Sequence, residues 1–217
     1  MRTNSFLILL CVAASLWAWQ QNPTFAEHNL VFSFNNLLHG RAWTLVTALF
    51  VHGNILHLLG NMLFLFVFGG TLEKTVGARN HLTIFFTGGL AGFILGLPFT
   101  PRGAGMLGAS AAIFTVAACV MLVRPLKFSW LFLAPQGLVA LIYFLYNIVV
   151  VSHPSLIRGH DPRVAYVAHI IGFITGLPFG IALSNHWKRN FLLTLLIFGL
   201  YLVILHVVAD WLFQASS

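Results

Sequence analysis

AHIIGFITG, residues 168–176, lies in an apolar run of membrane length and carries one imidazole, that of His169. A second apolar run begins with GASA, residues 108–111, and carries one serine, Ser110. Polar side chains at membrane depth are costly and usually serve a function. A hydroxyl and an imidazole are also the two groups of a nucleophile–base pair. A catalytic role therefore requires a fold that brings Ser110 and His169 together.

The composition is that of a membrane protein with several spans. Of the 217 residues, 59% are hydrophobic and 7% are charged, whereas a soluble domain carries about 25% charged residues. The net charge is +7, but the basic residues are scattered through short loops, which argues against a nucleic-acid-binding surface. Cys11 and Cys119 both lie in apolar runs, and this fits neither a disulfide framework nor a metal site. We predict an all-α, polytopic bundle in a single membrane domain over residues 1–217.

Seven segments are predicted to cross the membrane, since a spanning helix needs about 20 apolar residues. They are Ser5–Gln20, Ile55–Glu73, His81–Phe99, Ala109–Val123, Ser129–Val151, Val164–Ser184 and Phe191–Phe213. The first could instead be a signal peptide, but Trp17 and Trp19 favour a retained helix with an aromatic end at the interface. The connection 21–54 holds apolar pieces too short to cross, for which we expect short helices at the membrane surface.

The distribution of basic residues orients the predicted bundle. With the N-terminus inside, the inner loops hold seven of the 11 Lys and Arg residues and the outer loops hold four. This bias predicts an inside N-terminus and, with seven spans, an outside C-terminus. Spans two, four and six then run inward from the outer face. Counting about 1.5 Å per residue along them predicts that His57, Asn61, Ser110 and His169 all lie in the outer half of the bundle.

A serine hydroxyl needs a neighbouring base to become a nucleophile, and His169 is the best candidate for Ser110 by depth. A third group often orients the base, but acids are scarce. Glu73 is expected at the inner end of span two, and Asp161 in a solvated outer loop. We therefore expect a Ser–His dyad without a carboxylate, with the imidazole packed against Phe114, one turn after Ser110.

Acyl transfer also needs hydrogen-bond donors for the oxyanion. Ser110 would open a helix, whose first backbone N–H groups lack partners within the helix. Its N–H, the Asn61 amide and the His57 ring could together form the oxyanion hole. Gly108 would let the chain turn tightly before that helix. Polar residues at and before the start of span two, His52 among them, indicate a water-filled cavity open to the outside.

Each of these residues also has a structural interpretation. A lone serine in a membrane helix more often bonds its own backbone or a neighbour, and a lone histidine can be a proton relay or a structural hydrogen-bonder. The stretch GFITGLPF (172–179) nearly repeats GFILGLPF (92–99), with Gly89 aligned to His169. The glycines are therefore interpreted as helix-packing surfaces in both places, and the histidine needs another explanation. His52 and His57 are five residues apart and so do not share a helix face well. No carboxylate accompanies them, which disfavours a metal site.

Together the motifs resemble the rhomboid family of intramembrane serine proteases. In chain order they are His52, HLLGN (57–61), GGTLE (69–73), GAS (108–110) and AHIIGFITG (168–176). Each is weak alone, but they occur in the family's order, on the appropriate spans, over residues 41–184. The resemblance implies a rhomboid-like six-helix core over about residues 5–184, with the seventh span, about 191–213, as an addition.

The resemblance implies that Ser110 is the nucleophile and His169 the general base. It implies an oxyanion hole from Asn61, His57 and the Ser110 backbone, and a supporting cluster near the outer surface that includes His52. It further implies no cofactor or metal, and substrates that are membrane proteins cut near the outer face, where a transmembrane helix holds small or helix-breaking residues. Besides such substrates and the lipid bilayer we expect no nucleic-acid partner. We predict a multi-pass protein of a prokaryotic plasma membrane, with a cytoplasmic N-terminus and a site open to the outer side.

The sequence departs from the family pattern in span four. Ala111 stands where a glycine commonly follows the serine, and Ala117 and Ala118 replace later glycines. Two other functions stay open. A catalytically inactive rhomboid-like binding or quality-control factor is the first, although such relatives lose the serine or the histidine. A small transporter or channel is the second, but it would need a polar stripe through the whole bilayer. The natural substrate and the oligomeric state are left open.

Overall fold

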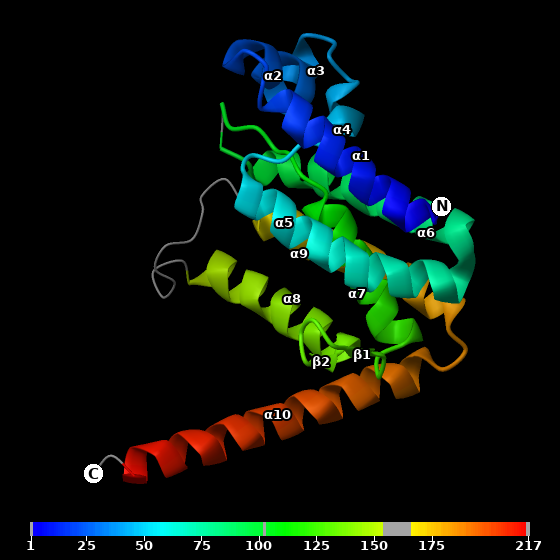
Figure 1. The fold of residues 1–217 in the computed structure, drawn as a ribbon, viewed down its shortest axis with the longest axis vertical. Helices are drawn as coiled ribbons and strands as arrows, with labels where there is room; N and C mark the ends of the chain where they lie inside the picture. The colour runs from blue at the N-terminus through cyan, green and yellow to red at the C-terminus, as the bar shows by residue number, and fades with distance from the viewer. Residues whose placement is uncertain (1, 102, 154–165, 216–217) are drawn as a thin grey trace.

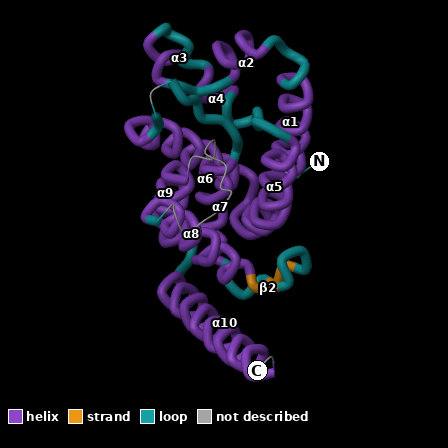
Figure 2. The backbone as a smooth tube through the Cα atoms, turned by 90° about the vertical axis from the view of Figure 1, so that its left-hand side faces the viewer, coloured by secondary structure: helices purple, strands orange, loops and turns teal. Residues whose placement is uncertain are grey.

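The computed structural model describes residues 2–101, 103–153 and 166–215 as a bundle of helices with a short two-stranded hairpin (Figure 1). Its elements in chain order are α1 (Thr3–Ala18), α2 (Pro23–Leu30), α3 (Phe34–Leu38), α4 (Thr44–Thr47), α5 (Ile55–Phe64), η1 (Leu65–Gly69), α6 (Gly70–Gly96), η2 (Leu97–Phe99), α7 (Ser110–Val123), β1 (Phe128–Ser129), β2 (Ala134–Pro135), α8 (Gln136–Ser152), α9 (Tyr166–Leu183) and α10 (Trp187–Ala215). The short helices α2, α3 and α4 gather at one end of the molecule and α10 lies at the other (Figures 1 and 2). The connection predicted to hold short helices does hold them.

The apolar helices agree with the predicted spans. Within the described residues, three helical segments are long and apolar enough to cross a membrane: Ile55–Phe99, Tyr166–Leu183 and Trp187–Leu212. Three shorter apolar helices, α1, α7 and α8, cover the other predicted spans. The longest segment turns at Gly77, whose φ of 83° is a left-handed conformation that favours glycine. That turn separates the predicted second and third spans, and the prediction of an all-α membrane bundle is confirmed.

The fifth span begins later than predicted. We expected it to start at Ser129, but α8 starts at Gln136. Residues 128–135 instead form the hairpin, in which β1 pairs antiparallel with β2. Pro135 fits this boundary, because proline lacks the N–H that a helix interior uses and biases the residue before it toward an extended conformation. Apolar composition alone could not separate this hairpin from the helix that follows.

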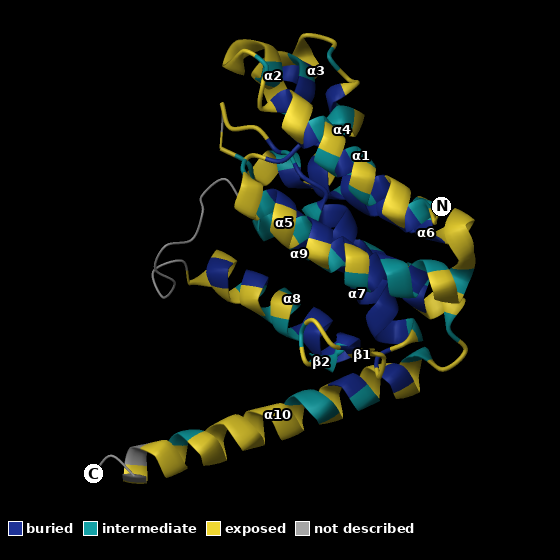
Figure 3. Ribbon diagram, in the orientation of Figure 1, coloured by how far each residue is buried: buried dark blue, intermediate teal, exposed yellow. Residues whose placement is uncertain are grey.

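Helix α7 is the centre of the bundle, and it appears dark blue along its length in Figure 3. All but a few of its side chains are buried, and it packs against α6, α8 and α9. Its contact with α9 is close because α9 presents glycines there. A Cβ atom at Gly172 would overlap the carbonyl oxygen of Ala111, and one at Gly176 would overlap that of Thr115. The Thr115 hydroxyl donates to the Gly172 carbonyl oxygen at 2.7 Å, which ties the two helices together.

The repeated glycine motifs lie on either side of α7. Gly92 of α6 faces the Ala111 methyl group, while its aligned partner Gly172 of α9 faces the Ala111 backbone. Gly88 of α6 lies against the Thr115 side chain. The methyl group of Ala111, which departs from the family pattern, therefore occupies space that Gly92 leaves open. The packing role assigned to both motifs matches these contacts.

The seventh predicted span forms α10, and among the described residues its hydrogen bond to the bundle lies near its start. The Asn190 side chain donates to the carbonyl oxygen of Leu122 at the end of α7, at 2.7 Å. A Cβ atom at Gly137 of α8 would meet the hydroxyl of Thr194 at 2.7 Å. Beyond this anchor the helix runs away from α7, and most of its residues are exposed (Figures 1 and 3).

Candidate active site

Ser110 is the first residue of α7, and the chain reaches it through a tight turn. Gly108 has a φ of 106°, which L side chains rarely adopt. Its N–H donates to the carbonyl oxygen of Ala48 at 2.7 Å. Earlier in the same loop, Met106 and Phe32 exchange two backbone hydrogen bonds. The turn that presents the Ser110 hydroxyl is thus fixed to the N-terminal part of the chain.

His169 of α9 faces Ser110 directly. Its Nε2 atom lies 2.7 Å from the Ser110 Oγ atom. The imidazole is 6% exposed, and it stacks on the Phe114 ring with centroids 4.7 Å apart and planes 10° apart. The close α7–α9 packing at Gly172, three residues after His169, explains how a short hydroxyl can reach the ring. The Ser110 Oγ and His169 Nε2 atoms are at the separation that a nucleophile and its general base require.

Asn147 of α8 is a site residue that the sequence reasoning missed. Its Oδ1 atom lies 2.7 Å from the Nδ1 atom of His169, on the side opposite Ser110. A signal was available: Asn147 is an amide within the apolar run Leu138–Val151, and polar side chains within membrane helices tend to be functional. The depth count applied to His169 would also have placed it in the outer half, a few residues before the end of span five.

His57 and Asn61 lie on one face of α5 and approach the turn at Gly108. A Cβ atom at Gly108 would come within 2.8 Å of the His57 ring and 3.4 Å of the Asn61 Nδ2 atom. Asn54 caps α5 by accepting a hydrogen bond from the His57 N–H at 2.8 Å. The Asn61 Nδ2 atom is buried and has no hydrogen-bond partner among the described residues. An orphaned buried donor beside the N-terminus of α7 is available to an anionic oxygen formed at Ser110.

His52 stabilises the turn before Ser110 through hydrogen bonds. Its Nε2 atom accepts from the Ala109 N–H at 3.4 Å, and its Nδ1 atom lies 3.0 Å from the Ser15 hydroxyl oxygen of α1. Burial, together with the nearby His57 ring, lowers the pKa of His52 to about 3, so the imidazole is neutral. Because Nε2 accepts, Nδ1 carries the proton and donates to Ser15. His52 therefore links α1 to Ala109, the residue before Ser110.

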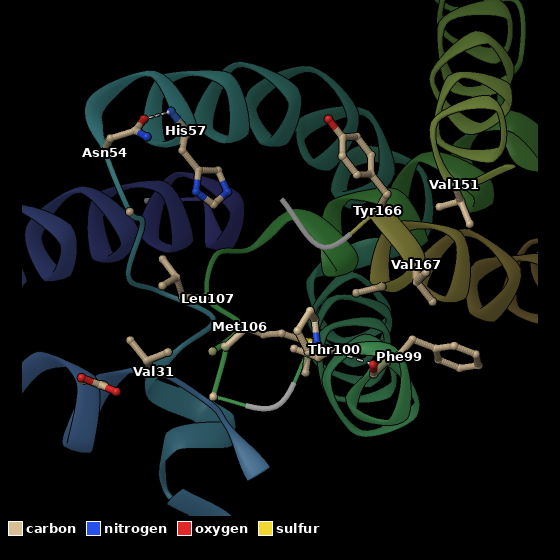
Figure 4. Close-up of a pocket in the computed structure, with 18 residues that line it drawn as sticks. Val31, Asn54, His57, Phe99, Thr100, Met106, Leu107, Val151, Tyr166 and Val167 are labelled. Carbon is tan, nitrogen blue, oxygen red and sulfur yellow. Dashed lines mark hydrogen bonds between the residues drawn. The ribbon is translucent and has the colours of Figure 1, made fainter. Parts of the chain in front are cut away.

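A cavity of about 690 Å³ opens beside the site (Figure 4). It is lined by the start of α5, the segment from Phe99 to Leu107, the end of α8 and the start of α9. His57 points into it from α5, and Val167 borders it from α9. Most of the lining is apolar, with Glu27, Asn54, His57 and Thr100 among the residues that supply polar groups. The cavity thus reaches His57 and Ala168, the residue before His169.

Of the acids in the described residues, Glu73 and Asp210 lie away from Ser110 and His169, whereas Glu27 of α2 lines the cavity beside them. The Glu73 carboxylate accepts hydrogen bonds from the N–H groups of Thr3 and Asn4 and so caps the start of α1. Asp210 lies 3.4 Å from His206 on the exposed part of α10. Asp161 lies outside the described residues. No group of three or more His, Cys, Asp or Glu side chains that could share a metal ion occurs in the described part of the chain.

The comparisons with known proteins agree with these motifs. The Rhomboid domain model matches residues 39–186. RHOMBOID-like protein 7 and RHOMBOID-like protein 2 of Arabidopsis thaliana are each 31% identical, over 73% and 76% of this chain and 50% and 51% of their own lengths. Rhomboid-type serine protease 2 of Emericella nidulans is 26% identical over 64% of this chain and 26% of its own length. The chain thus spans about half the length of the first two relatives, or less for the third. With the family model covering more than half of the chain, from before His52 to the end of α9, this integral membrane protein belongs to the rhomboid family.

Proposed function

We propose that this protein is an intramembrane serine endopeptidase in which Ser110 is the nucleophile and His169 the general base. The observation that carries the proposal is the 2.7 Å separation between the Ser110 Oγ and His169 Nε2 atoms. The alternative, a catalytically inactive binding factor, has no need of a hydroxyl and an imidazole in this geometry. Membership of a family that includes a named serine protease supports the same choice.

In the proposed reaction His169 transfers one proton in acylation and one in deacylation. Nε2 takes the hydroxyl proton as Ser110 Oγ attacks the scissile carbonyl carbon, and an imidazolium and a tetrahedral oxyanion result. The imidazolium then gives that proton to the leaving amine as the C–N bond breaks, which leaves an acyl ester on Ser110. Water, deprotonated by the same nitrogen, attacks the ester and releases the acid. Ser110 Oγ recovers its proton from His169.

The oxyanion is stabilised by donors that converge at the start of α7. The Ser110 N–H is the first of the helix, and such groups have no acceptor within the helix. The buried Asn61 Nδ2 atom supplies a second donor, and the His57 ring, 2.8 Å from a Cβ position at Gly108, is placed to supply a third. Because these donors surround Gly108, the absence of a side chain there keeps the hole open.

The substrates in this proposal are membrane proteins with helix-destabilising transmembrane segments. Carbonyl groups in an intact helix are already hydrogen-bonded, so an extended segment reaches Ser110 more readily. The basic-residue bias supports a cytoplasmic N-terminus, with the site near the outer face. The prokaryotic plasma membrane stays a prediction, because the reported relatives are eukaryotic.

Ser110→Ala tests the proposal, since it removes the nucleophile and little else. We expect the purified wild type to cleave a reporter helix in liposomes and to react with a fluorophosphonate probe, and the variant to do neither. Ser129→Ala is the matched control, because Ser129 is also buried but lies in the hairpin. If Ser110→Ala is labelled and cleaves like the wild type, Ser110 is not the nucleophile. If the folded wild type does neither, the inactive binding factor replaces this proposal.

Asn61→Ala tests the oxyanion hole. We expect kcat to fall about 100-fold with little change in KM, because the lost donor acts on charge that exists only in the transition state. Asn80→Ala, which removes an exposed amide on α6, controls for loss of a side-chain amide elsewhere. A rise in KM at constant kcat would mean that Asn61 binds the substrate rather than the oxyanion.

A further inference from the structure

Asn147 is a buried amide, and its contacts with Tyr143 and His169 continue to Ser110 as one chain. Only 3% of the residue is exposed. Its Nδ2 atom donates to the carbonyl oxygen of Tyr143, one turn earlier on α8, at 2.7 Å. Its Oδ1 atom lies 2.7 Å from His169 Nδ1, and His169 Nε2 lies 2.7 Å from Ser110 Oγ. One line of contacts therefore runs from the α8 backbone to the Ser110 hydroxyl.

The Tyr143 carbonyl decides which way the amide of Asn147 points. A carbonyl oxygen can only accept, so it must face the NH₂ group of Asn147. The opposite orientation would set two acceptor oxygens against each other. The Oδ1 atom consequently faces His169, and since Oδ1 also only accepts, the Nδ1 atom of His169 must carry the proton. In a neutral imidazole the Nε2 atom then has a free lone pair, and this lone pair faces Ser110.

We propose that Asn147 is the positioning residue of the base, holding His169 in the Nδ1–H tautomer that leaves Nε2 ready to accept the Ser110 proton. This inference rests on the proposed function of Ser110 and His169. Phe114 fixes the plane of the imidazole by stacking, but stacking leaves rotation within that plane free. The hydrogen bond to Asn147 removes that freedom, so the two contacts together define the position of Nε2.

An amide suits this position better than a carboxylate would. When His169 gains the Ser110 proton, the positive ring is stabilised by the Asn147 Oδ1 dipole through a stronger Nδ1–H···Oδ1 hydrogen bond. A carboxylate would stabilise it more, but it would also place a charge among the apolar helices α8 and α9 in every resting enzyme. Asn147 provides the acceptor without that charge, so His169 can be held in place without a carboxylate.

Three variants distinguish positioning from simple support of α8. Asn147→Leu keeps the approximate volume and removes the acceptor. Asn147→Asp keeps an acceptor oxygen, and when protonated its O–H can donate to Tyr143 as the amide does. Asn190→Leu removes another buried amide, one that ties α10 to α7 away from the site. All three are assayed for reporter cleavage as proteins that elute like the wild type in detergent, with thermal unfolding recorded alongside.

We expect Asn147→Leu to lower kcat about 10- to 100-fold with KM within twofold of wild type, because a misplaced base slows the chemical step alone. Asn147→Asp should recover at least part of that loss, and Asn190→Leu should keep wild-type kcat even if it unfolds at a lower temperature. Wild-type kcat in Asn147→Leu would overturn the proposal. So would an Asn147→Asp variant that is folded but as slow as Asn147→Leu, since the acceptor would then be irrelevant.

A spectroscopic test does not depend on activity. The ¹⁵N shifts of the His169 ring, assigned by their loss in His169→Ala, should show a protonated Nδ1 and an unprotonated Nε2 in wild type. In Asn147→Leu they should move toward a mixture of tautomers, and an unchanged spectrum would refute the positioning role. If wild-type cleavage fails while these shifts behave as expected, the proposed protease function is wrong but the contact of Asn147 with His169 stands.

Discussion

His169→Ala is expected to reduce reporter cleavage by on the order of 10⁴-fold. Without the imidazole the Ser110 hydroxyl has no proton acceptor at 2.7 Å, and its nucleophilicity falls to that of an ordinary alcohol. Labelling by a fluorophosphonate should fail in parallel, because the probe needs the same activated oxygen. The double variant Ser110→Ala/His169→Ala should be no slower than either single variant, since the two groups act as one unit.

The control for His169→Ala is the loss of another buried imidazole. His81 of α6 is fully buried, and neither ring nitrogen has a hydrogen-bond partner among the described residues. His81→Ala should therefore retain cleavage. His169→Gln covers the possibility that alanine leaves a hole beside Phe114, because it fills more of that space while offering no comparable base. If His169→Gln is folded and keeps wild-type turnover, another group must be the base.

Gly172→Leu is expected to separate α7 from α9 and to remove both stability and activity. A Cβ atom alone would overlap the Ala111 carbonyl oxygen, which is backbone and cannot rotate away. Moving α9 outward would also break the Thr115–Gly172 hydrogen bond. Overpacking and the lost bond together should lower the free energy of unfolding by roughly 3 kcal/mol. Cleavage should fall even in the folded fraction, because His169 lies three residues away on the same helix.

Gly199→Leu is the matched control for this substitution. Gly199 is also a helical glycine, in α10, but a Cβ atom there would meet nothing within 4 Å. Thermal unfolding in detergent should show a lowered midpoint for Gly172→Leu and a midpoint close to wild type for Gly199→Leu. Equal midpoints for the two variants would mean that the α7–α9 contact is not tightly packed.

Much of the candidate site follows from depth. Apolar length identified the spans, basic loops gave their direction, and counting along them put Ser110 and His169 at one level. Asn147 lies at the same predicted depth, but depth does not show which polar side chain contacts the base. The sequence interpretation considered only carboxylates as its partner and so left Asn147 out.

Other features of the fold could be recognised only in the tertiary structure. The start of α8 at Gln136 depended on the pairing of β1 with β2, and apolar composition does not distinguish a hairpin from a helix turn. The Ala111 methyl group has room because it faces Gly92, which lies on another helix, α6. Neither result is encoded in a local run of residues, because each arises from contact between segments far apart in the chain.

The amino-acid sequence by itself determined the membrane class and the family motifs and predicted the depth of the polar residues, since hydrophobic length and loop charge act locally along the chain. Only the tertiary structure decided which atoms meet. A hydrogen bond requires two atoms within about 3 Å, whereas counting residues gives depth and says nothing of the angle around the bundle. The approach of Ser110 to His169 and of His169 to Asn147 is set by how closely α7, α8 and α9 pack.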